Sequence, residues 1–270
     1  MGPFRLDRYR GFLVDIDGVL LRGTQPIGGS IQALAHLQQC GPTVLLSNNS
    51  TRSRADLAAH LTALGFTVSP EHALVSSSIA AEYLLATEGR TAVWCFGEEG
   101  LRSEVLTAGH TLAPAPHEAA WVVAGMDRHL TYQDLTNALH ALRSGARLLA
   151  TNTDATYPTT EGLIPGAGAI IGALTGMGYP PAIVVGKPSK IAFDVALLRL
   201  GLAAGDALMI GDRIDTDIVG ARDAGIHTAL LLSGVTGRQE LIGDNKPTWV
   251  ANDLTALVRG DALAGGAAFA

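Results

Sequence analysis

The feature that most limits the fold of this chain is a regular alternation of short apolar runs with segments of helical period. Apolar runs at residues 12–16 and 43–46 alternate with helical patterns at residues 31–37 and 54–66. In the second pattern Leu57, Leu61 and Leu64 share one helical face, and Gly65 supplies a stop. The alternation returns with strands expected at 207–210 and 228–232 and a helix expected at 216–226. Such an order predicts parallel strands joined by helices.

A second series of the same kind interrupts the first. Its expected strands lie in the segments TAVWCFG, AWVVAGMD, ARLLATN and AIVVG, and helical segments such as TYQDLTNALHALRSG separate them. We therefore expect an α/β protein with a parallel-sheet core formed by residues 1–79 and 185–270. Residues 80–184 are expected to form an inserted α/β domain.

Length and composition allow a sizeable core and exclude some partners. The chain has 270 residues, of which 47% are hydrophobic and 16% charged, and its net charge is −6 without a run of Lys or Arg. Neither nucleic acid nor a membrane is therefore an expected partner. No signal-like segment or membrane-length apolar run occurs, which predicts a cytoplasmic protein. Cys40 and Cys95 lie in apolar surroundings and are expected to be buried free thiols.

The run GFLVDIDGVLL, residues 11–21, places two carboxylates in an otherwise apolar stretch. In a strand, Asp15 and Asp17 would point to the same side. Burying bare carboxylates is unfavourable unless a cation or good hydrogen bonds meet them. One interpretation is a strand that ends at Val14 and is followed by a solvated turn, because Asp-Gly is a common turn pair. The other is a strand tip that presents both acids to a metal ion and a substrate.

Polar groups follow four expected strands at their carboxyl ends, where parallel sheets bind ligands. They are Asp15 with Asp17, then Ser47-Asn48-Asn49, then Lys187, and finally Asp212 with Asp215 and Asp217. Taken singly, helix capping explains the Ser-Asn-Asn run and an exposed loop explains Lys187. Asp215 is expected to cap the helix that begins near Thr216. Taken together, the four groups predict one ligand site at one edge of the sheet.

The order D-x-D-G, S-N-N, G-K-P and G-D-x-x-x-T-D resembles the signature of the haloacid dehalogenase-like (HAD) phosphatase superfamily. Its NagD-like, or 4-nitrophenylphosphatase, branch (subfamily IIA) is similar in the segments LLSNNSTRSRADLAAHLTALGF, ATNTDATYP, IPGAGAI and VVGKPSK. The resemblance covers the chain from about Gly11 to Gly234. It implies a Rossmann-like parallel-sheet HAD core, with the insert at 80–184 acting as an α/β cap domain.

The resemblance also implies a Mg²⁺-dependent phosphatase that hydrolyses small phosphate monoesters through an aspartyl-phosphate. The expected substrates are of the 4-nitrophenyl phosphate, nucleotide, sugar phosphate or glycerol phosphate type. Asp15 would attack phosphorus, and Asp17 would protonate the leaving oxygen and later activate water. Because Mg²⁺ prefers oxygen ligands, the expected metal ligands are the carboxylates of Asp15 and Asp212 and the backbone carbonyl of Asp17. Asp217 would not bind the metal directly but would orient a metal-bound water or Lys187.

Further residues are expected to hold the phosphate and the leaving group. Lys187, the hydroxyl of Ser47, the amide of Asn48 and backbone N–H groups around Gly18 would contact the phosphate oxygens. The candidate leaving-group contacts lie in the loop TNTDATYPTTEGLIPGAG and are Asn152, Asp154, Tyr157, Thr159, Thr160 and Glu161. Turn chemistry alone explains Asn152 and Asp154 equally well.

Several alternatives are weighed against the phosphatase. A phosphotransferase or mutase would use the same core. A non-enzymatic phosphometabolite-binding protein is disfavoured because Asp15, Asp17, Lys187 and Asp212 are all present. A dehalogenase would not need the acids Asp17 and Asp212. The run GAGAIIG lacks the spacing of a dinucleotide-binding loop, so close backbone packing at a helix start is expected there. The expected partner is a small phosphorylated metabolite, and family analogy implies a homodimer through the cap.

Overall fold

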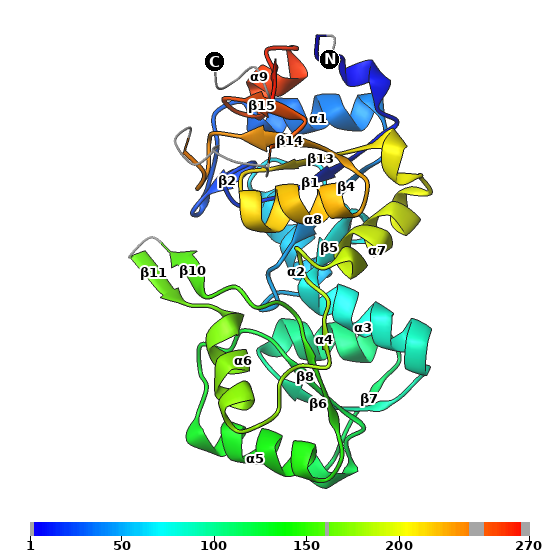
Figure 1. Ribbon diagram of the computed structural model, residues 1–270, viewed down its shortest axis with the longest axis vertical. Helices are drawn as coiled ribbons and strands as arrows, with labels where there is room; N and C mark the ends of the chain where they lie inside the picture. Colours follow the sequence, from blue (N-terminus) through cyan, green and yellow to red (C-terminus); the bar gives the residue numbers. More distant parts are fainter. Residues whose placement is uncertain (1–2, 160–161, 238–245, 266–270) are drawn as a thin grey trace. The chain divides into compact units, whose positions relative to one another are not determined.

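The computed structural model describes residues 3–159, 162–237 and 246–265. The chain divides into two compact units, which are coloured along the sequence in Figure 1. The first unit comprises Met1–Ser47, Ala58–Ala73 and Lys187–Ala270, and the second comprises Asn48–Leu57 and Leu74–Gly186. The expected insert at 80–184 lies inside the second unit, which also contains the short segment Asn48–Leu57.

The first unit is built on a sheet with the strand order β16–β15–β14–β13–β1–β4–β5, of which β5 belongs to this unit only by its first residue. The strands are β1 (Gly11–Val14), β4 (Thr43–Ser47), β5 (Ala73–Val75), β13 (Ala207–Gly211), β14 (His227–Leu231), β15 (Trp249–Ala251) and β16 (Leu263–Ala264). β1 pairs in parallel with both β13 and β4, and β14 continues the parallel order beyond β13. Strands buried on both faces read as continuous apolar runs, which is why the sequence predicted β1, β4, β13 and β14. The shorter β5, β15 and β16 were not predicted.

Helices cover both faces of this sheet. Figure 1 shows α1 (Ser30–Cys40) with α9 (Leu254–Val258) on one face, and α7 (Lys190–Leu200) with α8 (Val219–Asp223) on the other. α2 (Arg54–Ala63) follows β4 along the chain, and Gly65 with a φ of 97° ends its apolar face as expected. A parallel sheet with helices on both faces confirms the Rossmann-like α/β core.

The second unit has its own parallel sheet, in the order β12–β9–β8–β6–β7. Its strands are β6 (Ala92–Phe96), β7 (Thr111–Leu112), β8 (Trp121–Ala124), β9 (Arg147–Ala150) and β12 (Ile183–Val184). The helices are α3 (Ser76–Glu88), α4 (Glu99–Thr107), α5 (Tyr132–Arg143) and α6 (Ala167–Gly176), and β10 (Thr156–Thr159) pairs with β11 (Gly162–Pro165) as an antiparallel hairpin. Each of the four segments expected to hold a strand of the insert does hold one.

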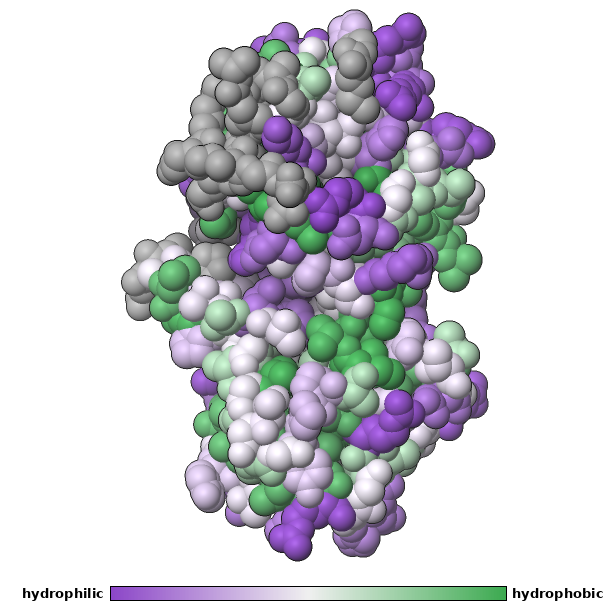
Figure 2. All heavy atoms as spheres, in the orientation of Figure 1, coloured by the Kyte–Doolittle hydropathy of each residue, from purple (hydrophilic) through white to green (hydrophobic). Residues whose placement is uncertain are grey.

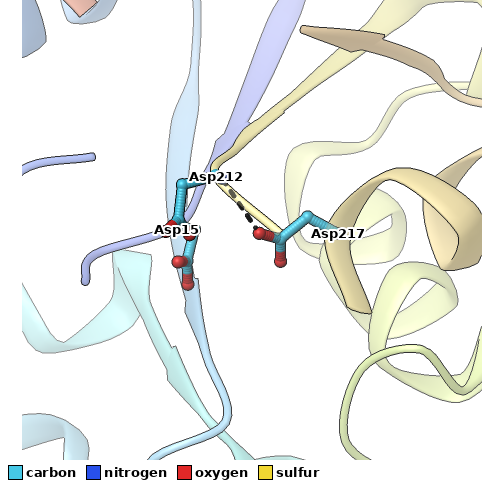
Figure 3. Close-up of side chains that lie close together, drawn as sticks. All are labelled: Asp15, Asp212 and Asp217. Atoms are coloured by element: carbon cyan, nitrogen blue, oxygen red, sulfur yellow. Dashed lines mark hydrogen bonds between the residues drawn. The ribbon is translucent and has the colours of Figure 1, made fainter. Parts of the chain in front are cut away.

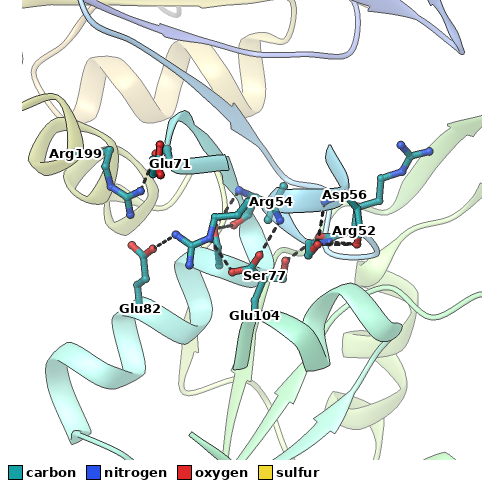
Figure 4. Close-up of polar contacts among 11 residues, drawn as sticks. Arg52, Arg54, Asp56, Glu71, Ser77, Glu82, Glu104 and Arg199 are labelled. Atoms are coloured by element: carbon teal, nitrogen blue, oxygen red, sulfur yellow. Dashed lines mark hydrogen bonds and ion pairs between the residues drawn. The ribbon is translucent and has the colours of Figure 1, made fainter. Parts of the chain in front are cut away.

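Within the second unit, one arginine joins three helices. The guanidinium of Arg54 on α2 donates to Glu82 Oε1 on α3 at 2.7 Å and to Glu104 Oε2 on α4 at 3.0 Å (Figure 4). The backbone N–H of Arg54 also donates to Glu104 Oε1 at 2.7 Å. The Glu104 side chain is only 3% exposed, so these bonds satisfy a buried carboxylate. The network fixes the segment Asn48–Leu57 to the body of this unit.

The first two glycines of the GAGAIIG run pack closely against backbone, as expected at a helix start, whereas the third, Gly172, has open space beside it. A Cβ at Gly166 would lie 2.3 Å from the carbonyl oxygen of Asp154, and one at Gly168 would lie 2.5 Å from that of Thr153. The start of α6 therefore rests directly on the loop that contains residues 153 and 154.

The prediction of two buried free thiols is right for one cysteine and wrong for the other. Both cysteines are free, and Cys95 on β6 is buried. Cys40 is exposed, because it is the last residue of α1 and lies outside the apolar face of that helix. Burial raises the pKa of the Cys95 thiol to about 12, which keeps it protonated and unreactive.

Among the described residues, no helix combines the length and the apolar character that a membrane crossing requires.

Candidate active site

Asp15 is placed by the sheet, directly after β1. Val14 pairs with Ile210 of β13, and the backbone N–H of Asp15 donates to the Ile210 carbonyl at 2.9 Å. The strand expected at 12–16 therefore ends at Val14. Its continuation is not a solvated turn, however, because Asp15 is only 7% exposed.

The chain turns sharply after Asp15. The backbone N–H groups of Leu20 and Leu21 donate to the Ile16 carbonyl at 2.8 and 3.0 Å, and this closes the turn. Gly18 has a φ of 80°, a conformation that favours glycine. A Cβ at Gly18 would lie 2.3 Å from Asp212 Oδ2, so the backbone there approaches the acid cluster closely. Asp17, within the same turn, is half-buried.

Lys187 lies between two buried carboxylates. Its Nζ donates to Asp15 Oδ1 at 2.6 Å and to Asp217 Oδ1 at 2.7 Å. The residue is 4% exposed, so the interpretation as an exposed loop lysine is wrong. Burial alone would lower the pKa of Lys187, but the charges of Asp15 and Asp217 outweigh it and raise that pKa above its ordinary value. Lys187 therefore stays protonated.

Asp212 and Asp217 complete the cluster from the loop after β13. Figure 3 shows the two carboxylates beside Asp15, and one oxygen from each of the three lies within 4.8 Å of the others. Asp217 Oδ2 accepts the backbone N–H groups of Asp212 at 3.2 Å and Arg213 at 3.1 Å. Asp212 Oδ2 accepts the backbone N–H of Val235 at 2.6 Å. Within the described part of the chain, the buried Oδ1 of Asp212 has no hydrogen-bond partner.

The cluster carries more negative than positive charge. Burial raises the pKa of Asp15 well above its ordinary value, and the neighbouring carboxylates add to this although Lys187 opposes it. Burial, with the charge of Asp217, raises the pKa of Asp212 to about 6. A hard divalent cation would neutralise this excess and bind through oxygen. The unpartnered Asp212 Oδ1 and the all-oxygen donor set therefore fit a divalent cation.

The other expected phosphate contacts lie in two places. Ser47 is the last residue of β4, next to β1 in the sheet, and is buried. Asn48 belongs to the second unit, where its carbonyl accepts Ser76 Oγ at 2.7 Å and Asn152 Nδ2 at 2.7 Å. Its own Nδ2 donates to Asp154 Oδ2 at 3.0 Å. Asn48, Asn152 and Asp154 therefore form one hydrogen-bonded group.

The remaining loop candidates are less closely connected. Tyr157 is half-buried, and its hydroxyl lies 3.5 Å from Asn49 Nδ2. Thr159 Oγ1 donates to the Gly162 carbonyl across the β10–β11 hairpin at 2.7 Å. Thr160 and Glu161 lie outside the described residues.

Two expectations about caps are corrected. Asp215 does not cap the helix after residue 213. Instead it pairs with Arg213, whose Nη2 lies 2.8 Å from Asp215 Oδ2. The Ser-Asn-Asn run does not cap α2 either, because Ser53 and Asp56 form that helix start through a 2.6 Å bond from Ser53 Oγ to Asp56 Oδ2. Asn49 instead closes a turn by accepting the N–H of Thr51 at 2.9 Å.

Sequence reasoning missed the loop Ser233–Thr236, whose Val235 N–H holds Asp212. The signal was present: the segment SGVT follows the strand expected at 228–232, so it lies at the carboxyl end of a parallel strand. The donor is a backbone N–H, however, and no side-chain type marks it.

The chain matches known family descriptions at both ends. Residues 12–111 match the haloacid dehalogenase-like hydrolases, and residues 184–257 match the HAD-hydrolase-like family. The 5′-nucleotidase YutF of Bacillus subtilis is 33% identical over 249 residues, covering 92% of this chain and 96% of that protein. The sugar-phosphatase AraL of the same organism is 36% identical over 226 residues and covers 83% of each chain.

Solved structures agree with this relationship. The p-nitrophenyl phosphatase of Archaeoglobus fulgidus superposes with a TM-score of 0.88 at 37% identity, covering 93% of this chain and 98% of that one. A glycerol phosphate phosphatase of Mycobacterium tuberculosis in complex with magnesium gives a TM-score of 0.86 at 33% identity, covering 95% and 78%. The same phosphatase is also known in complex with calcium.

The fold, the acid cluster and these relatives together show that the chain belongs to the haloacid dehalogenase-like hydrolases. Within that family it falls in the NagD-like branch, and it is a phosphatase.

Proposed function

We propose that this phosphatase hydrolyses small phosphate monoesters with Mg²⁺ as its cation and Asp15 as its nucleophile. The observation that carries the proposal is the arrangement around Asp15. Lys187 Nζ lies 2.6 Å from Asp15 Oδ1, and the unpartnered, buried Oδ1 of Asp212 belongs to the same cluster. Phosphoryl transfer to a carboxylate needs a nucleophile, a positive charge that neutralises the phosphate and an oxygen that can bind a metal ion.

Asp15 and Asp17 have different roles in the proposed reaction. A bond forms between an oxygen of Asp15 and phosphorus while the bond from phosphorus to the ester oxygen breaks. Asp17 gives its proton to the departing oxygen, and then takes a proton from the water that hydrolyses the aspartyl-phosphate. Asp17 suits this exchange because it is half-buried and lies in the turn that directly follows Asp15.

The metal would be held by the carboxylates of Asp15 and Asp212 and by the backbone carbonyl of Asp17. When bound, Mg²⁺ offsets the repulsion between the anionic ester and the attacking carboxylate. Asp217 is suited to a supporting position, because Lys187 engages its Oδ1 and backbone N–H groups engage its Oδ2. It orients Lys187 toward the phosphate.

The phosphate would be held by Lys187, the Ser47 hydroxyl, the Asn48 amide and backbone N–H groups around Gly18. Lys187 supplies the positive charge, and the neutral donors fix the orientation of the phosphate oxygens. Because Gly18 has no Cβ, its backbone can approach the phosphate closely, as it already approaches Asp212.

We assign the second unit, with the insert at 80–184, the role of a cap that recognises the leaving group. The relatives are named for nucleotide, sugar phosphate, glycerol phosphate and p-nitrophenyl phosphate hydrolysis, so we place the substrate among small organic phosphates. Tyr157 and Thr159 are the side chains assigned to the leaving group. Asn152 and Asp154 act on it indirectly, because both bond to Asn48.

Association through the second unit is part of the proposal. On the face in Figure 2, hydrophobic residues gather on the second unit. Its described hydrophobic side chains include the exposed Tyr132 and Leu163. Light scattering after size-exclusion chromatography measures the oligomeric state, and a monomer at micromolar concentration would contradict a homodimer. The expected cytoplasmic location stays a prediction.

Phosphate release from a panel of nucleotide, sugar, glycerol and 4-nitrophenyl phosphates tests the function. We expect release with Mg²⁺, none with EDTA, and none from Asp15→Asn. Asp194→Asn is the matched control, because Asp194 is exposed and pairs only with a neighbour on its own helix, Lys190, as far as the described residues show. Release that survives in Asp15→Asn would contradict the assignment of the nucleophile.

A further inference from the structure

The loop Ser233–Thr236, which follows β14, closes around Asp212. The backbone N–H of Val235 donates to Asp212 Oδ2 at 2.6 Å, and the backbone N–H of Thr236 donates to the Asp212 carbonyl at 3.3 Å. The loop therefore holds both the side chain and the main chain of this residue.

As a result, the two carboxylate oxygens of Asp212 differ in their hydrogen bonding. Oδ2 is engaged by Val235, whereas Oδ1 has no hydrogen-bond partner among the described residues. Asp212 is only 1% exposed, so solvent does not supply the missing partner. A buried carboxylate oxygen without a partner is unfavourable, and a ligand bound there removes the penalty.

The loop is itself anchored at its first residue. Ser233 Oγ donates to the Gly18 carbonyl at 2.6 Å, and Arg22 Nη2 donates to the Ser233 carbonyl at 2.8 Å. Gly18 lies in the turn that carries Asp17. The loop after β14 and the turn after β1 are therefore tied together, and both approach Oδ2 of Asp212.

Gly234 is required by contact with Asp212 and not by its backbone conformation. A Cβ at Gly234 would lie 1.9 Å from Asp212 Oδ2, closer than two such atoms can approach. Gly234 is not among the glycines with a positive φ, so an alanine could adopt its backbone conformation. Substitution there would act directly on the Asp212 carboxylate.

We propose that the Ser233–Thr236 loop is a positioning element for the divalent cation, with Gly234 as its contact point. By engaging Oδ2 of Asp212, the loop fixes the carboxylate and presents Oδ1 to the cation. The inference rests on the proposed function for its choice of Mg²⁺. Residues that orient metal ligands typically change metal affinity about 10–100-fold when they are mutated.

Calorimetric titration of the EDTA-treated full-length chain with Mg²⁺, in the absence of substrate, tests the proposal. We expect Gly234→Ala to bind Mg²⁺ about 10–100-fold more weakly than the unaltered chain. Gly205→Ala is the matched control, because a Cβ at Gly205 meets nothing within 4 Å and its φ is not positive. The control should bind with unchanged affinity.

Ser233→Ala keeps the test decisive if Gly234→Ala does not fold. It removes one hydroxyl donor and adds no bulk, and we expect it to weaken Mg²⁺ binding several-fold. Folded variants at both positions that bind Mg²⁺ as tightly as the unaltered chain would overturn the proposal. A chain that binds Mg²⁺ in this loop-dependent way yet releases no phosphate would remove the proposed function and leave the inference standing. Mg²⁺-dependent hydrolysis by a chain whose Mg²⁺ affinity neither substitution alters would overturn the inference and leave the proposed function standing.

Discussion

Lys187 is a buried ammonium group among several carboxylates, and its contribution is to the charge balance of the site. It contacts Asp15 and Asp217 directly, while Asp212 lies in the same cluster. A buried ion pair is weak evidence for stability, because desolvation offsets the attraction. Its position in the interior therefore fits the proposed phosphate binding better than a role in folding.

Replacing Lys187 tests that explanation. We expect Lys187→Met to lower kcat about 10²–10³-fold, the range seen when one transition-state donor is removed. It should also lower the thermal midpoint in EDTA, because Asp15 and Asp217 lose their shared partner. Steady-state kinetics and thermal unfolding provide the measurements. Lys190→Met, at an exposed lysine three residues away, is the control. A Lys187→Met variant with unaltered kcat would contradict the assigned role.

At the scale of elements, the loop at 151–154 and the segment at 48–57 act as one hydrogen-bonded body within the second unit. Asn152 and Asp154 hold the carbonyl and the amide of Asn48, and α6 begins directly against this loop. Formation of a local turn does not account for these hydrogen bonds, because they join residues about a hundred positions apart in the sequence. The loop at 151–154 therefore positions Asn48, which is proposed to bind the phosphate.

Asp154→Ala separates positioning from turn formation. Loss of one hydrogen bond to Asn48 Nδ2 amounts to about 1 kcal/mol, so kcat/KM should fall about 5–10-fold while the thermal midpoint changes little. Thr153→Ala, at an exposed side chain in the same loop, should leave kcat/KM unchanged. A loss of stability without a change in kcat/KM would show that Asp154 serves the turn alone.

The hydrogen bonds and ion pairs of Arg54 are expected to stabilise the protein. Removing one partner leaves a buried charge unpaired, so Arg54→Met should destabilise the protein by about 3–5 kcal/mol. The fall in the urea midpoint measures the effect. Arg52→Met is the control, because its side chain is exposed and points away from the Arg54 network in Figure 4. Equal midpoints for the two variants would show that the network adds nothing.

Much of the core could be predicted from the sequence, because buried parallel strands are continuous apolar runs and each ends in a polar group. Asp15, Lys187, Asp212 and Asp217 were identified in this way, and the structure brings them together. The burial of Lys187 was not evident, because a lysine before a proline fits a surface loop equally well. The bonds of Asn152 and Asp154 to Asn48 could not be foreseen, since they depend on how the second unit folds. Val235 acts through a backbone N–H, which any residue except proline supplies.

At the scale of the whole molecule, the acid cluster makes the stability of the chain depend on pH. The pKa of Asp212 is raised to about 6 in the folded protein, whereas an unfolded aspartate titrates near about 4. Between these values the folded chain binds a proton that the unfolded chain does not. Stability without metal therefore falls as the pH rises through this window.

Mg²⁺ should reverse that fall if it binds the ionised carboxylates as proposed. We expect the rise in thermal midpoint on adding Mg²⁺ to be larger at about pH 8 than at about pH 5. Thermal unfolding with Mg²⁺ and with EDTA at both pH values measures it. Asp212→Asn, which lacks the titrating group, should show a smaller dependence on pH. The same stabilisation at both pH values would contradict the link between cation binding and this cluster.

The central claim is that Asp15 carries the phosphoryl group during turnover. Its most direct test is acid quenching of the Asp17→Asn variant with 4-nitrophenyl phosphate and Mg²⁺, followed by mass spectrometry of the peptides. Because Asp17 is proposed to activate the hydrolytic water, its loss should let the intermediate accumulate. The account predicts a phosphoryl group on the peptide that contains Asp15, removable by hydroxylamine and missing from the Asp15→Asn, Asp17→Asn double variant. A variant that releases 4-nitrophenol but never carries a phosphoryl group on Asp15 would contradict it.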